Sequence, residues 1–216
     1  MRRTLLPLLL ALTLAARALA TAEVTELGDG LAYMRVRSLA TAAETLDAVL
    51  PQGRALVLDL RAGQASVEDP AVLGALLARR RGPGPLYILV GPQTPAAFRV
   101  PLSRLPSGAL TLGIAGSVPA PAVVIDQAPD ADRRAYEALD AGTPLEQLVS
   151  GKIEKERFDE ASLVKEFENG NPYAEPPPSP DPAGTKPAEP KDAIPTDRVL
   201  QRALHLHRAL AALKAR

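Results

Sequence analysis

The sequence predicts an α/β protein with a mostly parallel sheet and flanking helices. Short apolar runs alternate with amphipathic segments between Leu31 and Ile125, which is typical of strand–helix–strand units. The clearest run, RALVLDLR at 54–61, has four consecutive apolar residues bounded by turn residues, as in a strand buried on both faces. Asp59 and Arg61 follow at its carboxyl end, where open α/β sheets commonly place their sites.

Two interpretations of Asp59 and Arg61 are open. Paired charges at strand ends are common structural features, so we favour a structural pair over a direct chemical role. Either interpretation makes these two residues the polar signature of the predicted sheet.

The other elements follow from apolar spacing and from the residues that begin and end helices. Pro51 stops one predicted helix, and Asp69 with Pro70 after it is a favoured helix start, with Asp69 as the cap. Three prolines limit any helix in 92–105 to one or two turns. The predicted strands are 31–37, 54–61, 85–91, 109–114 and 122–126, and the predicted helices are 41–50, 69–81, 130–139, 143–149 and 159–167.

Three consecutive arginines, 79–81, close the second of these helices near its negative dipole end. A solvated helix end is the favoured interpretation. A patch for anionic lipid or a protein partner is the alternative.

The first twenty residues resemble a secretory signal. Arg2 and Arg3 precede an apolar stretch at 5–16, and small residues at 18 and 20 predict cleavage after Ala20. The apolar stretch is too short for a stable transmembrane span. We therefore expect a signal peptide over 1–20 and export to the periplasm or cell envelope, with an uncleaved anchor as the alternative.

The composition excludes several classes of function. Without the signal, 22 basic and 25 acidic residues leave a charge of −3, which gives no support for a nucleic-acid partner. The sequence has no cysteine, so no disulfide framework is expected. No cofactor or metal site is predicted either. Asp126, Asp130 and Asp132 lack the spacing of a calcium loop, and a helix cap at Asp130 beside a solvated loop is favoured over weak calcium binding.

The carboxyl-terminal part changes character. Nine of the 25 residues from 172 to 196 are proline, which predicts an extended, semi-rigid linker over 171–196 after a domain that covers 21–170. Residues 197–216 then have the apolar spacing of a helix. We favour docking of this helix on the domain over pairing with a partner, because a lone helix of this length is marginal in water.

The order of these segments resembles the catalytic core of the tail-specific (C-terminal processing) serine peptidases. The matching segments are 30–36 (GLAYMRV), 57–61 (VLDLR), 87–90 (YILV) and 112–113 (LG), and 197–204 (DRVLQRAL) is similar to the helix that ends many of these peptidases. The resemblance implies a crotonase-like fold and descent from enzymes of proteolysis.

The sequence departs from the family at its chemistry. The family's Asn-x-Gly-Gly continuation, which helps to stabilise an oxyanion, is replaced by AGQA at 62–65. The nucleophile segment reads TPAA at 94–97, with Ala96 in the serine's place. The segment that holds the family's general-base lysine, 113–119 (GIAGSVP), contains no lysine, and the peptide-binding PDZ insertion is missing.

No other residue set replaces the lost pair. A hydroxyl nucleophile needs an adjacent base, and the two histidines, His205 and His207, lie in the tail helix at a spacing that points them to different faces. Ser103 and Ser117 lie in the right region, but no base accompanies them. We therefore predict no catalytic residue.

The predicted function is a non-catalytic, exported module that binds a peptide or protein in a groove near Gly63, Thr94 and Ala97. One alternative is a serine-type peptidase with an unrecognised catalytic set. Another is a structural or assembly protein that acts through its C-terminal helix.

Overall fold

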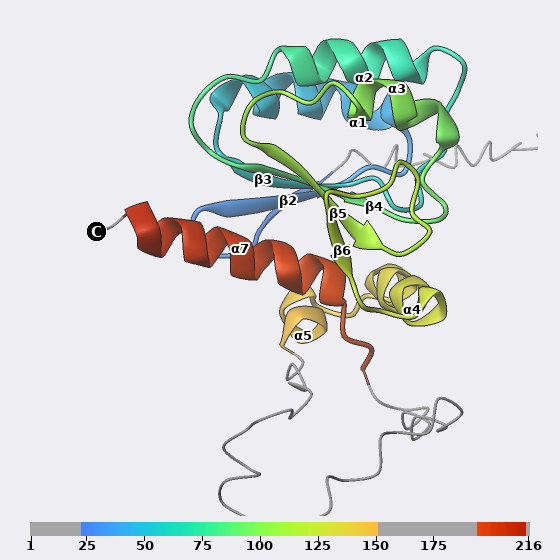
Figure 1. Cartoon of the computed structure of the whole chain (residues 1–216), viewed down its shortest axis with the longest axis vertical. Helices are drawn as coiled ribbons and strands as arrows, with labels where there is room; N and C mark the ends of the chain where they lie inside the picture. The colour runs from blue at the N-terminus through green and yellow to red at the C-terminus, as the bar shows by residue number, and fades with distance from the viewer. Residues whose placement is uncertain (1–22, 151–193, 215–216) are drawn as a thin grey trace, which may run out of the picture.

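The computed structural model describes residues 23–150 and 194–214, and these residues form one mixed sheet with helices on both faces (Figure 1). Each strand lies beside the strand that follows it in the chain, so the spatial order is the sequence order. All pairs are parallel except the first, which is antiparallel. The strands are β1 (Val24–Glu26), β2 (Leu31–Arg35), β3 (Ala55–Asp59), β4 (Leu86–Val90), β5 (Ala109–Ile114) and β6 (Val123–Ile125).

The predicted α/β class is confirmed, and each of the five predicted strands is present. The central strands β3 and β4 are buried along their whole length, as expected for a parallel sheet covered on both faces. Strand β1 was not predicted, because its sequence, VTE, offers only one aliphatic residue.

The first layer of helices covers the upper face of the sheet in Figure 1. Alternate side chains of the strands, such as Leu56, Leu58 and Ile88, point into this layer and pack on Leu46 and Leu73 of the helices. Asp69 begins its helix but does not cap it: Glu68 occupies the cap position, and the Asp69 carboxylate accepts the Ser66 N–H at 2.6 Å. The elements of this layer are α1 (Leu39–Val49), η1 (Leu50–Gln52), α2 (Asp69–Ala78), η2 (Ala96–Phe98) and α3 (Arg99–Leu102).

The second layer lies on the opposite face and consists of α4 (Pro129–Asp140), α5 (Leu145–Val149) and α7 (Arg198–Lys214) (Figure 1). Helix α7 buries Leu200 and Leu204 against Val57 and Leu89 of the sheet. The predicted docking of the C-terminal helix is therefore confirmed.

The predicted signal peptide, the predicted helix 159–167 and most of the predicted linker lie outside the described residues.

None of the helices in the described ranges has the combination of length and apolarity that crossing a membrane requires.

The prediction that the arginine triplet 79–81 forms a solvated helix end is only partly right. Arg80 is buried, and its guanidinium donates to the carbonyl oxygens of Arg54, Gly84 and Pro85 at 2.9, 2.6 and 3.2 Å. Burial lowers the pKa of Arg80. Arg79 pairs with Asp47 of α1. The end of α2 is therefore not simply a solvated cationic end, because its middle arginine fastens the loop before β4 to the residue before β3.

Candidate functional site at the carboxyl end of the sheet

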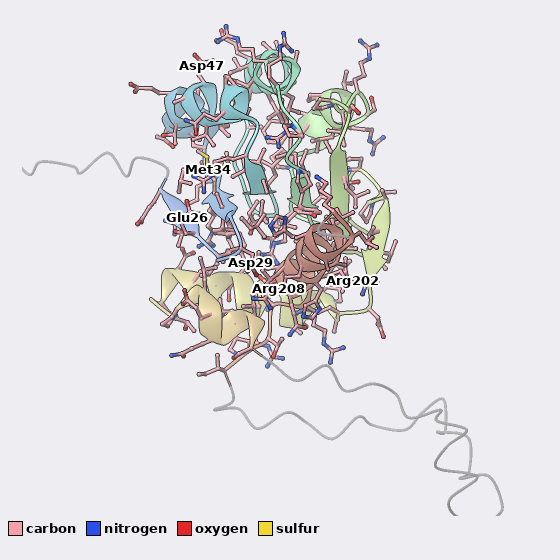
Figure 2. All side chains as sticks on the ribbon, turned by 90° about the vertical axis from the view of Figure 1, so that its left-hand side faces the viewer. Glu26, Asp29, Met34, Asp47, Arg202 and Arg208 are labelled. Carbon is pink, nitrogen blue, oxygen red and sulfur yellow. The ribbon has the colours of Figure 1, made fainter. Side chains whose placement is uncertain are left out.

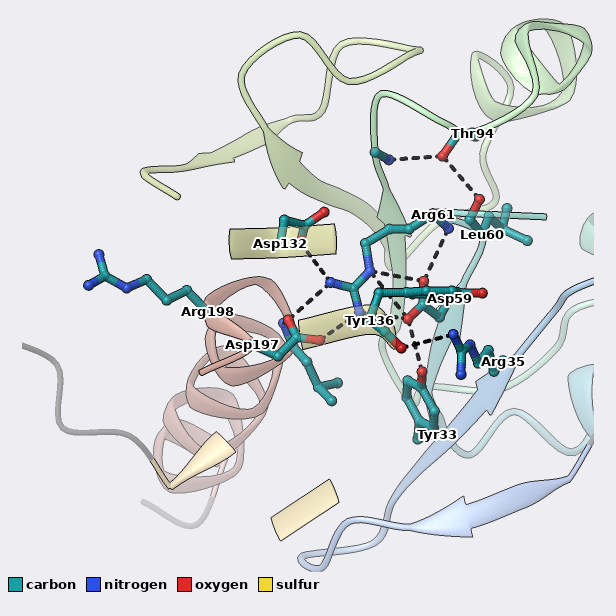
Figure 3. A network of polar contacts seen from close by, with 12 residues as sticks. Tyr33, Arg35, Asp59, Leu60, Arg61, Thr94, Asp132, Tyr136, Asp197 and Arg198 are labelled. Carbon is teal, nitrogen blue, oxygen red and sulfur yellow. Dashed lines mark hydrogen bonds and ion pairs between the residues drawn. The ribbon is translucent and has the colours of Figure 1, made fainter. Parts of the chain in front are cut away.

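A buried arginine lies at the centre of the most densely bonded polar site among the described residues (Figure 3). Arg61 follows β3 by two residues, and its side chain is 2% exposed. Its guanidinium contacts three carboxylates: Nη2 lies 2.8 Å from Asp59 Oδ2 and 2.6 Å from Asp197 Oδ2, and Nη1 lies 2.8 Å from Asp132 Oδ1. The site joins the central strand to the start of α7 and to α4.

Asp59 is completely buried at the end of β3, and four donors satisfy it. It accepts the Nε, Nη2 and backbone N–H of Arg61, and the Tyr33 hydroxyl donates to it at 2.9 Å. Burial by itself would raise the pKa of Asp59, but the charge of Arg61 and these hydrogen bonds hold it below its ordinary value. The same burial, together with the negative charge of Asp59, holds the pKa of Tyr33 well above its usual range.

Asp197 links the site to the C-terminal helix. Its carboxylate accepts the Leu200 N–H at 2.9 Å, which is the N-cap arrangement that aspartate favours. Its own backbone N–H donates to the Leu148 carbonyl of α5 at 2.8 Å. Because Arg61 holds the same carboxylate through both Nη atoms, the N-terminus of α7 is bound directly to the end of β3.

Asp132 differs electrostatically from Asp59. Burial raises the pKa of Asp132, and the negative charges of Asp197 and Asp59 raise it further, while Arg61 offsets only part of the shift. Asp132 is one of three carboxylates that contact the same guanidinium. Burial disfavours the charged form of Arg61, yet the three carboxylates hold its pKa well above the ordinary value.

The position of Asp132 corrects the interpretation of the aspartates near the start of this helix. Asp132 is buried in α4 rather than part of a solvated loop, and Asp130 lies in the first turn beside Arg133, after the cap residue Ala128. In ranges 23–150 and 194–214, no group of three or more histidine, cysteine, aspartate or glutamate residues is placed to hold a metal ion.

A second arginine, Arg35, lies beside this site and contacts Tyr136 and Asp140 of α4. The Arg35 guanidinium lies 3.5 Å from the centroid of the Tyr136 ring and bonds Asp140 at 2.8 Å, while the Arg61 guanidinium lies 5.5 Å from the same ring. Tyr136 therefore packs between the buried site and the outer ion pair.

We expect the Asp132→Asn variant to be as stable as the wild type at neutral pH, or more stable by up to about 1 kcal/mol. The amide oxygen still accepts the bond from Arg61, while one surplus negative charge is removed. The pKa of Asp132 is higher in the folded than in the unfolded state, so the penalty for its ionisation is present at neutral pH and disappears as the pH falls to about 4. Urea unfolding at both pH values should show the advantage only at neutral pH.

Asp59→Asn is the matched comparison, because the pKa of Asp59 is shifted in the opposite direction. Its stabilising contribution is present above about pH 4 and is lost as the pH falls through its lower folded value, so this variant should lose about 3 kcal/mol at neutral pH. Equal losses in the two variants would contradict the assignment of Asp132 as the surplus charge.

A cavity of about 340 Å³ lies beside the site, at the carboxyl ends of β3 and β4. Arg61, Pro92 and Gln93 line one side of it, and α4 lines the other with Tyr136 and several acidic residues. The cavity occupies the position where α/β sheets commonly bind ligands. Its buried cation, however, is already held by three carboxylates.

The three residues predicted to border a groove lie nearby but do not line this cavity. Thr94 is buried, and its hydroxyl donates to the Leu60 carbonyl at 3.0 Å and accepts the Gly91 N–H at 2.8 Å. Gly63 is half-buried, and Ala97 is exposed on η2. Thr94 therefore fastens the loop after β4 to the end of β3.

The candidate hydroxyls are bonded to the backbone. Ser117 is buried and donates to the carbonyls of Ile114 and Val90 at 2.7 and 3.2 Å, and Ser103 donates to Val100 at 2.8 Å. Within the described ranges, neither hydroxyl is hydrogen-bonded to a basic side chain. His207 is also occupied, since its Nε2 lies 2.9 Å from the Asp29 carbonyl oxygen.

Sequence reasoning found Asp59 and Arg61 but missed their partners. Asp132 and Asp197 lie 71 and 136 residues from Arg61 in the chain, so no local spacing connects them. The one available signal was Asp197 at the start of a predicted helix, where a cap was to be expected.

The fold and the site define the molecule as an α/β protein whose sheet and C-terminal helix are joined by a buried arginine–aspartate cluster. No protein-family model matches this sequence, and neither does any curated protein.

Proposed function

We propose that this chain is an exported, non-catalytic relative of the tail-specific serine peptidases that binds a peptide or protein in the periplasm or cell envelope. Its α/β domain would be crotonase-like. The support comes from the resemblance of the segments in β2, β3, β4 and β5, and from the Asp59-Leu60-Arg61 sequence at the end of β3.

The observation that carries this proposal is the position of Ala96. It begins η2, directly after the loop that follows β4, and it is exposed. Thr94, two residues earlier, bonds the Leu60 carbonyl beside the end of β3. A methyl group therefore stands where the resemblance places the attacking oxygen, and a methyl group cannot act as a nucleophile.

The place of the general base supports the same proposal. The segment 113–119, at the end of β5 and in the turn after it, contains no lysine, and its hydroxyl, on Ser117, donates to two backbone carbonyls. A scaffold that has lost both reactive groups can still present its surfaces to a partner, so binding is the function we favour.

Assembly through the C-terminal helix is a weaker candidate. The apolar face of α7 packs on the sheet through Val199, Leu200, Ala203 and Leu204. That face is therefore already used within the molecule. Leu210 and Leu213 remain exposed near the end of the helix.

A fluorophosphonate probe tests the loss of catalysis. Mature protein incubated with the probe and with unstructured peptides should remain unlabelled and leave the peptides intact, while binding to at least some of the peptides should be measurable by fluorescence anisotropy. Ser103→Ala and Ser117→Ala serve as matched variants. Labelling of one serine that is lost in its alanine variant would establish the alternative, a serine-type peptidase with a different catalytic set.

A further inference from the structure

We propose that the outer edge of β6, together with the neighbouring face of α7, binds an extended acidic segment of another protein as an added strand. This inference rests on the proposed binding function and names its site. The site is separate from the cavity beside Arg61 and from the groove predicted near Gly63, Thr94 and Ala97.

The first observation is the free edge of the sheet. Within the described residues, β6 pairs only with β5, so its outer side presents unpaired backbone N–H and C=O groups. Val124, at the middle of the strand, is 62% exposed, although it is a large aliphatic residue. Unpaired backbone beside an exposed aliphatic side chain is the arrangement to which extended peptides add.

The second observation is a groove of about 260 Å³ between this strand and α7. Val124, Ile125 and Asp126 form its strand side, and Arg198, Arg202 and His205 are among the residues of its helix side. The side chain of Ile125 packs on the core beneath α7, whereas the side chain of its neighbour Val124 points to the opposite face of the sheet. The groove therefore lies on the face of β6 that is turned toward α7.

The charges of the groove select the occupant. Two guanidinium groups, those of Arg198 and Arg202, oppose the single carboxylate of Asp126. The Arg198 side chain donates to the Asp126 carbonyl at 3.3 Å, whereas the side chain of Arg202 is exposed and forms no hydrogen bond or ion pair with the described part of the chain. Figure 2 labels Arg202 beside α7, to the right of the helix in that view. An arginine side chain beside a strand edge, with no partner among residues 23–150 and 194–214, complements a carboxylate on an added strand.

Strand geometry then gives the sequence class of the partner. Side chains of an added strand alternate between the two faces of the sheet. Those on the α7 side would meet Arg198 and Arg202, and those on the other side would lie next to Val124. The partner that fits is an extended segment in which acidic residues alternate with aliphatic ones.

The test uses the full chain and a fluorescein-labelled peptide in which glutamate and valine alternate four times. Fluorescence anisotropy at low salt should show saturable binding that weakens with added salt. R202E should weaken binding by about tenfold or more, since it replaces attraction with repulsion. R208E is the matched control on the same helix: Arg208 is also exposed, but it pairs with Asp29 away from the groove, so this variant should bind as the wild type does.

Two further peptides test the mode of binding. Methylation of the backbone nitrogens at every second residue, on the edge that would face β6, should abolish binding, because it removes the donors of the added strand. A lysine–valine peptide should not bind.

Each contrary outcome has a distinct meaning. If R202E binds the acidic peptide as tightly as the wild type does, the peptide binds elsewhere, and the β6–α7 site is overturned while the proposed binding function stands. If acidic, basic and neutral peptides all fail to bind, both proposals fail. If the protein dimerises with concentration in analytical ultracentrifugation and the dimer excludes the peptide, the edge belongs to a second copy of the chain, which also overturns the inference.

Discussion

Arg61→Met is expected to destabilise the protein by about 3–5 kcal/mol. The substitution keeps much of the side-chain volume but leaves three carboxylates, Asp59, Asp132 and Asp197, without the cation that each of them contacts. Removing one partner of a buried ion pair is costly because the remaining charge stays desolvated, and here the remaining charges also repel one another. The measurement is urea unfolding followed by circular dichroism, with the soluble yield as a second readout.

Arg61→Lys keeps the experiment informative if the methionine variant does not fold. An ammonium group retains the charge but cannot reach all three carboxylates in the forked geometry of a guanidinium, so its loss should be intermediate. Arg133→Met is the control, because Arg133 pairs with Asp130 and Glu137 at the surface, and its removal should leave unfolding unchanged within error. A methionine variant at position 61 as stable as the wild type would show that the cluster is not a stabilising element.

Asp197→Ala is expected to release α7 from the sheet and to cost about 3 kcal/mol. The substitution removes the cap on the Leu200 N–H and the contact with both Nη atoms of Arg61. Hydrogen exchange of the α7 amides and trypsin cleavage after Arg202 and Arg208 should both become faster than the global unfolding rate requires.

Asp197→Asn separates the two contributions. The amide oxygen still caps the helix, so this variant should retain part of the protection and lose only the charge-assisted bond to Arg61. Asp130→Ala is the surface control on another helix and should leave α7 protected. Unchanged exchange of α7 in Asp197→Ala would mean that apolar packing alone, through Leu200 and Leu204, holds the helix.

Most of the fold was predictable because its elements carry strong local signals. The uninterrupted apolar runs of β3 and β4 identify strands buried on both faces, and the prolines and glycines between the elements mark their limits. Strand β1 carried no such signal: a three-residue edge strand forms because β2 offers a free edge, which is a property of the folded sheet.

The site was only half predictable for a related reason. Asp59 and Arg61 are neighbours in sequence, and their position at a strand end is a local pattern. Charges at helix ends and in the loops beside them are usually solvated, and the sequence favours that interpretation for Asp132 and Arg80, yet tertiary contacts bury both. Whether a charged residue in or beside a helix meets water or a partner depends on which helix covers which face, and local periodicity does not determine that.

The two layers of helices also imply an order of events during synthesis. The face under α1, α2 and α3 is covered by segments that alternate with the strands, so it closes as the chain emerges. The other face exposes Tyr33, Val57 and Leu89 until α7, which follows all the strands in sequence, reaches it. A nascent or truncated chain that lacks α7 therefore presents an uncovered apolar surface, which is prone to aggregation until the last helix covers it.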